Sequence, residues 1–95
     1  MQDSFTLIAG PCSAESREQV LSAASGLQNA GISYFRSGIW KPRTRPGAFE
    51  GVGHTGLPWL QEVQSTFGMK VCVEVAQPRH VDAALKAGID MMWIG

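Results

Sequence analysis

Hydrophobic and polar positions along this chain form two kinds of block, short apolar runs and longer amphipathic stretches. The apolar runs are bounded by turn residues or polar residues, and runs of this length predict buried strands. They cover residues 5–9, 34–39, 70–76 and 91–94. The first ends at Gly10-Pro11, a dipeptide that stops a strand and begins a turn.

The amphipathic stretches between these runs predict helices, because their apolar residues recur at helical spacing and form one face. The residues of these faces are Val20, Ala24 and Leu27, then Leu60, Val63 and Phe67, then Val81, Ala84 and Leu85. Ser16 and Gln19 have the spacing of a capping box, in which each side chain satisfies a free amide of the other residue. Gly31, Gly68 and Gly88 are placed to end the three helices.

The predicted order of elements alternates strand and helix, which indicates a parallel sheet covered by helices. The segments Ala30-Gly31-Ile32-Ser33 and Ala87-Gly88-Ile89-Asp90 support a repeated unit, since each lies where a helix passes into a strand. An open doubly wound sheet and a barrel both fit this pattern. A complete barrel needs about 250 residues. We therefore expect residues 1–95 to form a single incomplete domain, either a fragment or a chain that a partner completes.

Composition excludes several functional classes. The chain has 95 residues, 44% of them hydrophobic, and a formal net charge of zero. A neutral chain gives no support to nucleic-acid or membrane binding, and no run of about 18 apolar residues is present. Cys12 and Cys72 cannot form a disulfide framework where no secretory signal is seen. We expect a cytoplasmic protein with reduced thiols.

Although the net charge is zero, the charged residues are unevenly distributed along the chain. Arg36, Lys41, Arg43 and Arg45 lie within ten positions, and no Asp or Glu occurs between residues 19 and 49. Arginine presents a planar fork to phosphate or carboxylate and lysine a compact charge, so the segment predicts a site for a small anion. The alternatives are a solvated basic loop and structural ion pairs to acidic residues, namely Glu15 or Glu74.

Other candidates also lie near the predicted carboxyl ends of strands, where parallel βα folds bind ligands. Cys12 is open to three interpretations: a small buried hydrophobe, a nucleophile or a soft metal ligand. Glu74 could orient a lysine or a water, or form an ion pair, whereas Cys72 is expected in the core. His54 and His80 are expected at the surface or at a helix start.

Two motifs carry a resemblance to a known family. At Ile8-Ala9-Gly10-Pro11-Cys12-Ser13 and Lys41-Pro42-Arg43-Thr44 the chain resembles type I 3-deoxy-D-arabino-heptulosonate-7-phosphate (DAHP) synthases. These enzymes share a branch with the 3-deoxy-octulosonate-8-phosphate synthases. The combination of Gly-Pro-Cys-Ser with Arg36, four intervening residues and Lys-Pro-Arg-Thr is specific. The octulosonate enzymes typically have Lys-Ala-Asn-Arg at this loop, so the heptulosonate enzyme is favoured.

The resemblance implies the N-terminal half of a (β/α)8 TIM barrel, about four βα units with parallel strands and outer helices. It also implies the first step of the shikimate pathway, in which phosphoenolpyruvate and erythrose 4-phosphate condense to DAHP and release phosphate. Cys12 is then a ligand of a divalent metal (Mn²⁺, or Fe²⁺, Co²⁺ or Zn²⁺). Arg36 and Lys41 would contact phosphoenolpyruvate, and Arg43 and Thr44 would contact erythrose 4-phosphate.

Further expectations complete this interpretation. Lys41 and Cys12 are the expected catalytic residues, and Glu74 is expected to contribute to substrate binding. The complete enzyme is expected to be a homo-oligomer, and a fused chorismate mutase domain occurs in some relatives. Competing functions are 3-deoxy-octulosonate-8-phosphate synthesis, a non-catalytic phosphate-binding α/β module, and a structural fragment with no intact pocket.

The first prediction concerns the isolated chain. In the family, the other metal ligands (a histidine, a glutamate and an aspartate) and a further phosphoenolpyruvate arginine come from segments after Gly95. We therefore expect no synthase activity from the 95-residue polypeptide. Phosphate release should be assayed with purified chain, manganese and both substrates; measurable turnover would refute the prediction.

Overall fold

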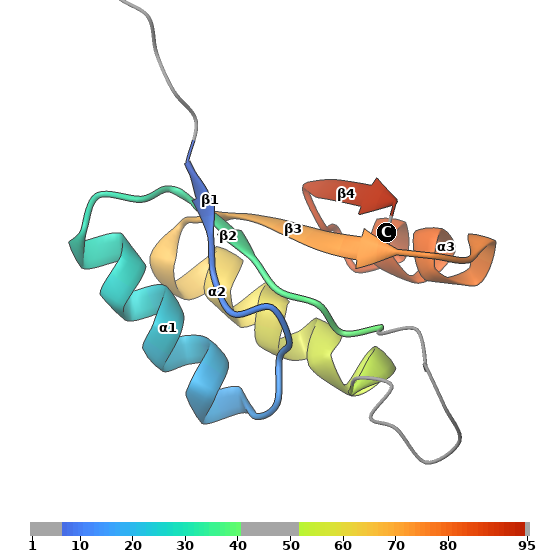
Figure 1. Cartoon of the computed structure of the whole chain (residues 1–95), viewed down its shortest axis with the longest axis horizontal. Helices are drawn as coiled ribbons and strands as arrows, with labels where there is room; N and C mark the ends of the chain where they lie inside the picture. The colour runs from blue at the N-terminus through green and yellow to red at the C-terminus, as the bar shows by residue number, and fades with distance from the viewer. Residues whose placement is uncertain (1–6, 41–51, 95) are drawn as a thin grey trace, which may run out of the picture.

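The structure is a computed structural model that describes residues 7–40 and 52–94. Its elements alternate as expected from the sequence (Figure 1). In chain order they are β1 (Ile8–Ala9), α1 (Arg17–Asn29), β2 (Tyr34–Arg36), the 3-10 helix η1 (Gly53–Gly56), α2 (Leu57–Phe67), β3 (Lys70–Val75), α3 (Pro78–Lys86) and β4 (Met91–Ile94). The sequence pattern did not predict η1.

The four strands form one parallel sheet in the order β1-β2-β3-β4. Each new strand is added on the same side of the previous one. Right-handed crossovers in one direction place successive helices on the same face of a sheet, whereas a doubly wound sheet reverses its strand order. Figure 1 shows α1 and α2 side by side along one face. This is the arrangement of consecutive units in a (β/α)8 barrel.

The helix-facing side of the sheet supplies the hydrophobic core. Alternate strand residues, among them Phe35, Val71 and Val73, are fully buried there because successive side chains of a strand point to opposite faces. They pack in one cluster with residues of the helices, including Val20 of α1 and Leu60 of α2. The other side of the sheet is the inner face of the barrel arc.

β2 is shorter than the predicted run of residues 34–39. Regular pairing ends at Arg36, although Ser37 N still donates to Cys72 O at 3.2 Å. Gly38 then pairs with Ser13 in an isolated bridge beyond β1. The chain therefore stays beside both of its neighbours after the strand has formally ended.

The predicted capping box at the start of α1 is only half correct. Ser16 Oγ accepts a hydrogen bond from Gln19 N at 3.1 Å, as expected. Gln19 Oε1, however, accepts from Glu15 N at 2.9 Å rather than from the amide of Ser16. Gln19 Nε2 also donates to Ser13 O at 3.1 Å. The glutamine thus fixes the loop between β1 and α1 as well as the helix start.

The predicted buried face of α3 is wrong at one position. Leu85 is 60% exposed, whereas His80 is only 4% exposed and Ala84 is fully buried. His80 Nδ1 accepts a hydrogen bond from Ala76 N at 3.1 Å, which satisfies an amide beyond the end of β3. The expectation of a helix-start position therefore holds for His80, but the expectation of a surface position does not.

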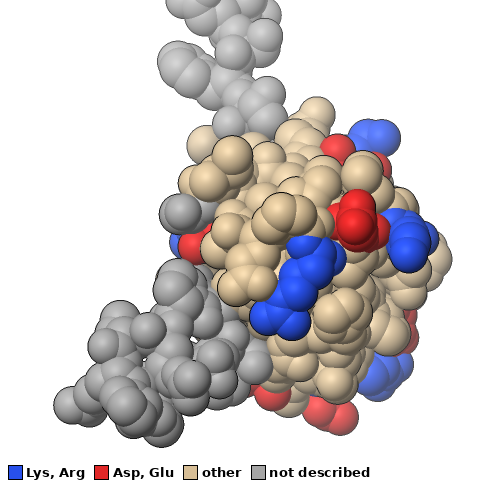
Figure 2. All heavy atoms as spheres, turned by 90° about the vertical axis from the view of Figure 1, so that its right-hand side faces the viewer, with Lys and Arg blue, Asp and Glu red and all other residues tan. Residues whose placement is uncertain are grey.

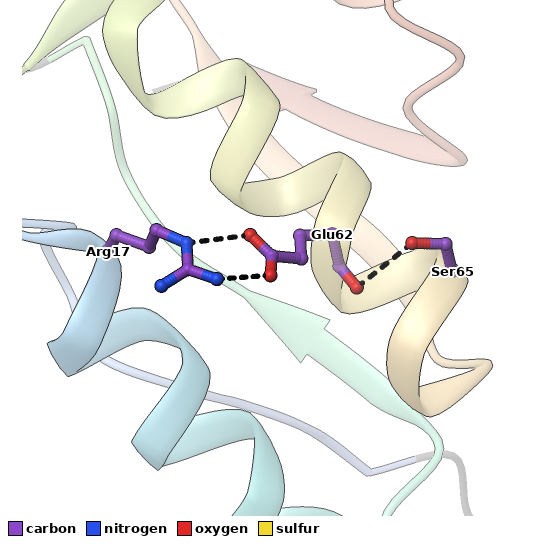
Figure 3. Close-up of polar contacts among 3 residues, drawn as sticks. All are labelled: Arg17, Glu62 and Ser65. Carbon is purple, nitrogen blue, oxygen red and sulfur yellow. Dashed lines mark hydrogen bonds and ion pairs between the residues drawn. The ribbon is translucent and has the colours of Figure 1, made fainter.

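An ion pair links α1 to α2 at their outer surfaces. Arg17 Nε donates to Glu62 Oε1 at 2.9 Å, and a second guanidinium nitrogen contacts Oε2 (Figure 3). The hydrogen bond lowers the pKa of the Glu62 carboxyl and raises the pKa of Arg17. Because both groups are solvated, the pair adds little to stability. It connects α1 and α2.

Asp90 joins three elements at the end of the sheet opposite the strand carboxyl ends. Its Oδ2 accepts from Val71 N at 2.8 Å and from Gln64 Nε2 at 2.9 Å. Burial acts to raise the pKa of Asp90, but these two hydrogen bonds and the charge of Lys70 outweigh it, so the pKa is lowered overall. The carboxylate is therefore the form that the folded state stabilises.

We predict that Asp90→Ala lowers the free energy of unfolding by about 1 kcal/mol at neutral pH, because two hydrogen bonds are lost. A lowered pKa in the folded state contributes stability that is present above the unfolded pKa and is lost as pH falls through the folded value. The difference in the free energy of unfolding between wild type and Asp90→Ala should therefore narrow below about pH 4. Denaturant unfolding at several pH values measures it.

The matched control is Asp82→Ala, at an exposed position of α3. It should leave the free energy of unfolding almost unchanged. An equal loss in both variants would contradict the role assigned to Asp90.

Candidate active site

The loop after β1 runs along the residues that follow β2. Gly38 N donates to Cys12 O at 3.1 Å, and Ala14 N donates to Gly38 O at 2.8 Å. These bonds extend the parallel pairing beyond the strands themselves. They place Cys12, whose side chain is exposed, at the carboxyl-terminal rim of the sheet beside the end of β2.

A close backbone approach brings Cys12 and Arg36 to this rim. A Cβ atom at Gly10 would lie 2.1 Å from Arg36 O, and Gly10 has φ +149°, which L side chains rarely adopt. Only glycine, which lacks a Cβ, allows two backbone segments to come this near. The Gly10-Pro11 turn therefore directs the chain across the end of β2 and then to Cys12.

Arg36 lies on the inner face of the barrel arc. Its Cα pairs in register with Cys72 of β3, and Glu74 is two residues farther along the same face. Burial raises the pKa of the Cys72 thiol, while the positive charge of Arg36 acts in the opposite direction. Arg36, Cys72 and Glu74 thus share one surface near the carboxyl ends of β2 and β3, and Trp93 of β4 pairs with Glu74.

Three of the predicted site residues, Lys41, Arg43 and Thr44, lie outside the described residues. The residues on either side of that segment are described. Ile39 O accepts from Gly53 N at 2.7 Å, so the two ends of the segment meet. Trp40, directly before Lys41, is 7% exposed. The roles of the three residues stay predictions, and the segment that carries them starts and ends beside the end of β2.

On this side of the molecule, the charged side chains of the described residues are of both signs (Figure 2). β3 and β4 point toward the right of Figure 1, and Figure 2 shows that side with basic and acidic side chains interspersed over the described surface. Of the predicted basic cluster, only Arg36 lies within the described residues.

The described residues supply part of a metal site at most. Within residues 7–40 and 52–94, no three His, Cys, Asp or Glu side chains lie together as a metal would need. Cys12 nonetheless has the exposure and the position at the rim that a ligand requires, and a thiolate is a soft ligand for a transition metal. A metal would need its other ligands from outside these ranges.

Sequence reasoning missed the aromatic cluster beside this rim. The ring of Trp40 stacks on His80, with centroids 4.4 Å apart and planes 7° apart, and meets His54 edge-on at 5.8 Å. The spacing of His80 and Ala84, four residues apart on one helix face, was the available signal. The partner of His80, forty positions earlier, could not be inferred from periodicity.

Comparison with known proteins now identifies the family. A sequence profile described as the DAHP synthetase I family matches residues 1–95. The chain belongs to the DAHP synthetase I family. The resemblance inferred from the Gly-Pro-Cys-Ser and Lys-Pro-Arg-Thr motifs is therefore confirmed.

Individual relatives agree with this family. The chain is 46% identical over 70 residues to a phospho-2-dehydro-3-deoxyheptonate aldolase of Thermotoga maritima, a match that covers 74% of this chain and 21% of the relative. It is 35% identical over 95 residues to a 2-dehydro-3-deoxyphosphooctonate aldolase of Campylobacter jejuni, over 93% of this chain and 35% of the relative. The chain thus spans about a fifth to a third of the length of these proteins.

A solved structure supports the same conclusion for the fold. The crystal structure of the DAHP synthase of Thermotoga maritima matches with a TM-score of 0.88 and 38% identity, over 96% of this chain and 26% of that one. The prediction of consecutive βα units from a (β/α)8 barrel is confirmed. The octulosonate enzymes are the more distant relatives, in agreement with the Lys-Pro-Arg-Thr loop of this DAHP synthetase family member.

The close approach at Gly10 generates the third prediction. In Gly10→Ala the new methyl group would meet the carbonyl oxygen of Arg36, so the β1 loop or the end of β2 must shift. We expect a loss of roughly 1–3 kcal/mol in the free energy of unfolding, measured by denaturant unfolding.

The matched control is Gly26→Ala within α1, where a new Cβ would meet nothing within 4 Å. Replacing a glycine inside a helix should stabilise the protein by roughly 0.5–1 kcal/mol. If Gly10→Ala were as stable as this control, the close approach would not constrain the site.

Proposed function

We propose that the protein carrying this chain is a 3-deoxy-7-phosphoheptulonate synthase, which condenses phosphoenolpyruvate with erythrose 4-phosphate and releases phosphate. The observation that carries the proposal is the meeting of Cys12, Arg36 and Glu74 at one rim of a barrel arc in a chain of the DAHP synthetase I family. Ligands of such barrels bind at this rim.

Arg36 is assigned to phosphoenolpyruvate, whose phosphate and carboxylate both match a guanidinium fork. The backbone of Arg36 is fixed in β2, and its register with Cys72 places the side chain on the inner face. Lys41, by its place in the sequence directly after Trp40, is assigned to the same substrate. Arg43 and Thr44 are assigned to erythrose 4-phosphate. Together these cations would offset the repulsion between two phosphorylated reactants.

The reaction joins carbon 3 of the enol phosphate to the aldehyde carbon of the sugar phosphate. Water adds at carbon 2, and the bond between carbon 2 and the phosphate oxygen breaks. A divalent metal held in part by Cys12 would act as a Lewis acid toward the aldehyde. Holding both reactants beside one another removes much of the entropic barrier. Glu74 is assigned to orienting a lysine or a water on the inner face.

The proposal also covers the cellular location and the assembly of the enzyme. No helix in the described ranges is long and apolar enough to cross a membrane. The proposal includes a cytoplasmic location, where thiols such as those of Cys12 and Cys72 stay reduced. Assembly as a homo-oligomer, and fusion to a chorismate mutase domain, are properties to be examined in the complete protein.

The fourth prediction tests this function in the complete protein with manganese. Turnover should be faster with erythrose 4-phosphate than with arabinose 5-phosphate, followed as phosphate release. Arg36→Ala should raise the KM for phosphoenolpyruvate roughly tenfold or more, because a charged hydrogen bond is lost. Arg17→Ala, at the exposed ion pair with Glu62, is the control and should leave this KM unchanged.

Other outcomes would select other functions. Preference for arabinose 5-phosphate would assign the protein to octulosonate-8-phosphate synthesis. If neither aldose phosphate turned over but phosphoenolpyruvate still bound in calorimetry, a non-catalytic phosphate-binding module would be indicated. Unchanged binding in Lys41→Ala would then discredit the anion site itself.

A further inference from the structure

The sheet has two edge strands, β1 and β4, and within the described residues each of them pairs with one neighbour only. The large hydrophobic side chains that are exposed in these ranges are Leu7 (64%), Ile8 (41%), Leu85 (60%) and Ile94 (87%). Leu7 and Ile8 lie at β1, Ile94 lies in β4, and Leu85 is on α3, the helix that leads into β4. The described chain therefore exposes its large apolar side chains at the two edges of the sheet.

The inner face between these edges is open as well. By strand register, the apolar residues that share this face with Arg36 are Ile8, Tyr34, Met91 and Trp93. Ile8 is exposed and the other three are half-buried. In a complete (β/α)8 barrel the inner side chains of eight strands pack together as a core. Four strands supply one side of such a core.

The shape of the sheet is that of half a barrel. The chain matches the barrel of the Thermotoga maritima enzyme with a TM-score of 0.88 over 96% of its length, so its strands have the tilt and curvature of that barrel. Its four strands follow one another in sequential order around the arc. A second copy, turned by half a revolution about the barrel axis, would supply the other four strands of the ring. It would place β4 of each copy beside β1 of the other, in parallel.

Charge is compatible with two copies facing each other. The chain has a formal net charge of zero, and each inner face carries Arg36 and Glu74 near the carboxyl ends of its strands. Two copies would bring equal numbers of these opposite charges into one interior, which a buried charge requires. Lys70, at the other end of the face, acts on Asp90 of its own copy and lowers the pKa of that carboxyl.

A second copy satisfies more of the open surface than other arrangements do. One added strand would pair a single edge and leave the inner face uncovered. Two copies joined through β4 alone would leave both β1 edges, with Leu7 and Ile8, exposed. A closed ring leaves no edge, and a two-fold axis repeats the same β4–β1 junction twice.

We propose that the 95-residue polypeptide binds a second copy of itself to form a two-fold symmetric barrel of eight parallel strands, in which β4 of each copy pairs with β1 of the other. The inner faces of both copies then form one core that encloses Ile8 and Trp93. This assembly is independent of the reaction proposed above, because it follows from the edges and the curvature of the sheet.

The fifth prediction concerns the mass of the purified 95-residue chain in solution. Sedimentation equilibrium over a concentration series should reach twice the 10.2 kDa of one chain and no larger species, because a closed ring has no edge for a third copy. Ile94→Lys and Leu7→Lys change side chains that are exposed in the single copy. Each should raise the dissociation constant of the dimer roughly tenfold or more, since the added charge lies at both junctions.

The matched control is Thr66→Lys, which adds the same charge at an exposed position of α2, away from both edges. It should leave the dissociation constant unchanged, and an effect as large as that of Ile94→Lys would overturn the proposal. So would a wild type that stays at the mass of one chain or forms species larger than a dimer. If Ile94→Lys separated the copies and Leu7→Lys did not, the closed barrel would be wrong.

A measurement on the wild type covers variants that fail to fold. Amide hydrogen exchange should slow roughly tenfold or more in peptides of both β1 and β4 as the concentration rises through the range in which the dimer forms. Exchange that does not depend on concentration at either edge would overturn the proposal. Protection of β4 without protection of β1 would overturn the closed ring in the same way.

Discussion

The close contact between Gly10 and the backbone of Arg36 is the constraint on which the rest of the site depends. A Cβ at residue 10 would lie 2.1 Å from the Arg36 carbonyl oxygen, so the loop after β1 can cross the end of β2 only where a side chain is missing. This crossing is continued by the hydrogen bonds between Cys12, Ala14 and Gly38. The Gly-Pro-Cys-Ser motif therefore has a structural reason for its glycine.

The order and direction of the strands place this contact at one rim of the sheet. Strands added sequentially and in parallel bring all of their carboxyl ends to one rim, with the helices confined to the outer face. The outer side chains of β3 are valines that the helices bury, whereas the inner side includes Cys72 and Glu74. One strand thus packs against the helices with one face and presents a thiol and a carboxyl group on the other, because its side chains alternate.

His80 adds a second support to the same rim. Its hydrogen bond to Ala76 and its stack on Trp40 join the end of β3 to the residue before Lys41. Stacked rings restrict each other's position, so the side chain of Trp40 is fixed relative to α3.

Much of this arrangement was determined by the sequence itself. The alternation of apolar runs and amphipathic stretches gave the order of strands and helices, because strand and helix periods differ and each element buries one face. The Gly-Pro-Cys-Ser and Lys-Pro-Arg-Thr motifs gave the family. Gly68 ended α2 in the left-handed conformation, as its position predicted. These signals are local, so a linear pattern contains them.

Only the tertiary structure decided which partners distant residues would meet. Leu85 was assigned to the apolar face of α3 and is exposed, whereas His80 is buried and stacks on Trp40. The strand register that places Arg36 beside Cys72 could likewise not be predicted from the sequence. Contacts between positions about forty residues apart depend on how elements pack, and periodicity within one element does not contain that information.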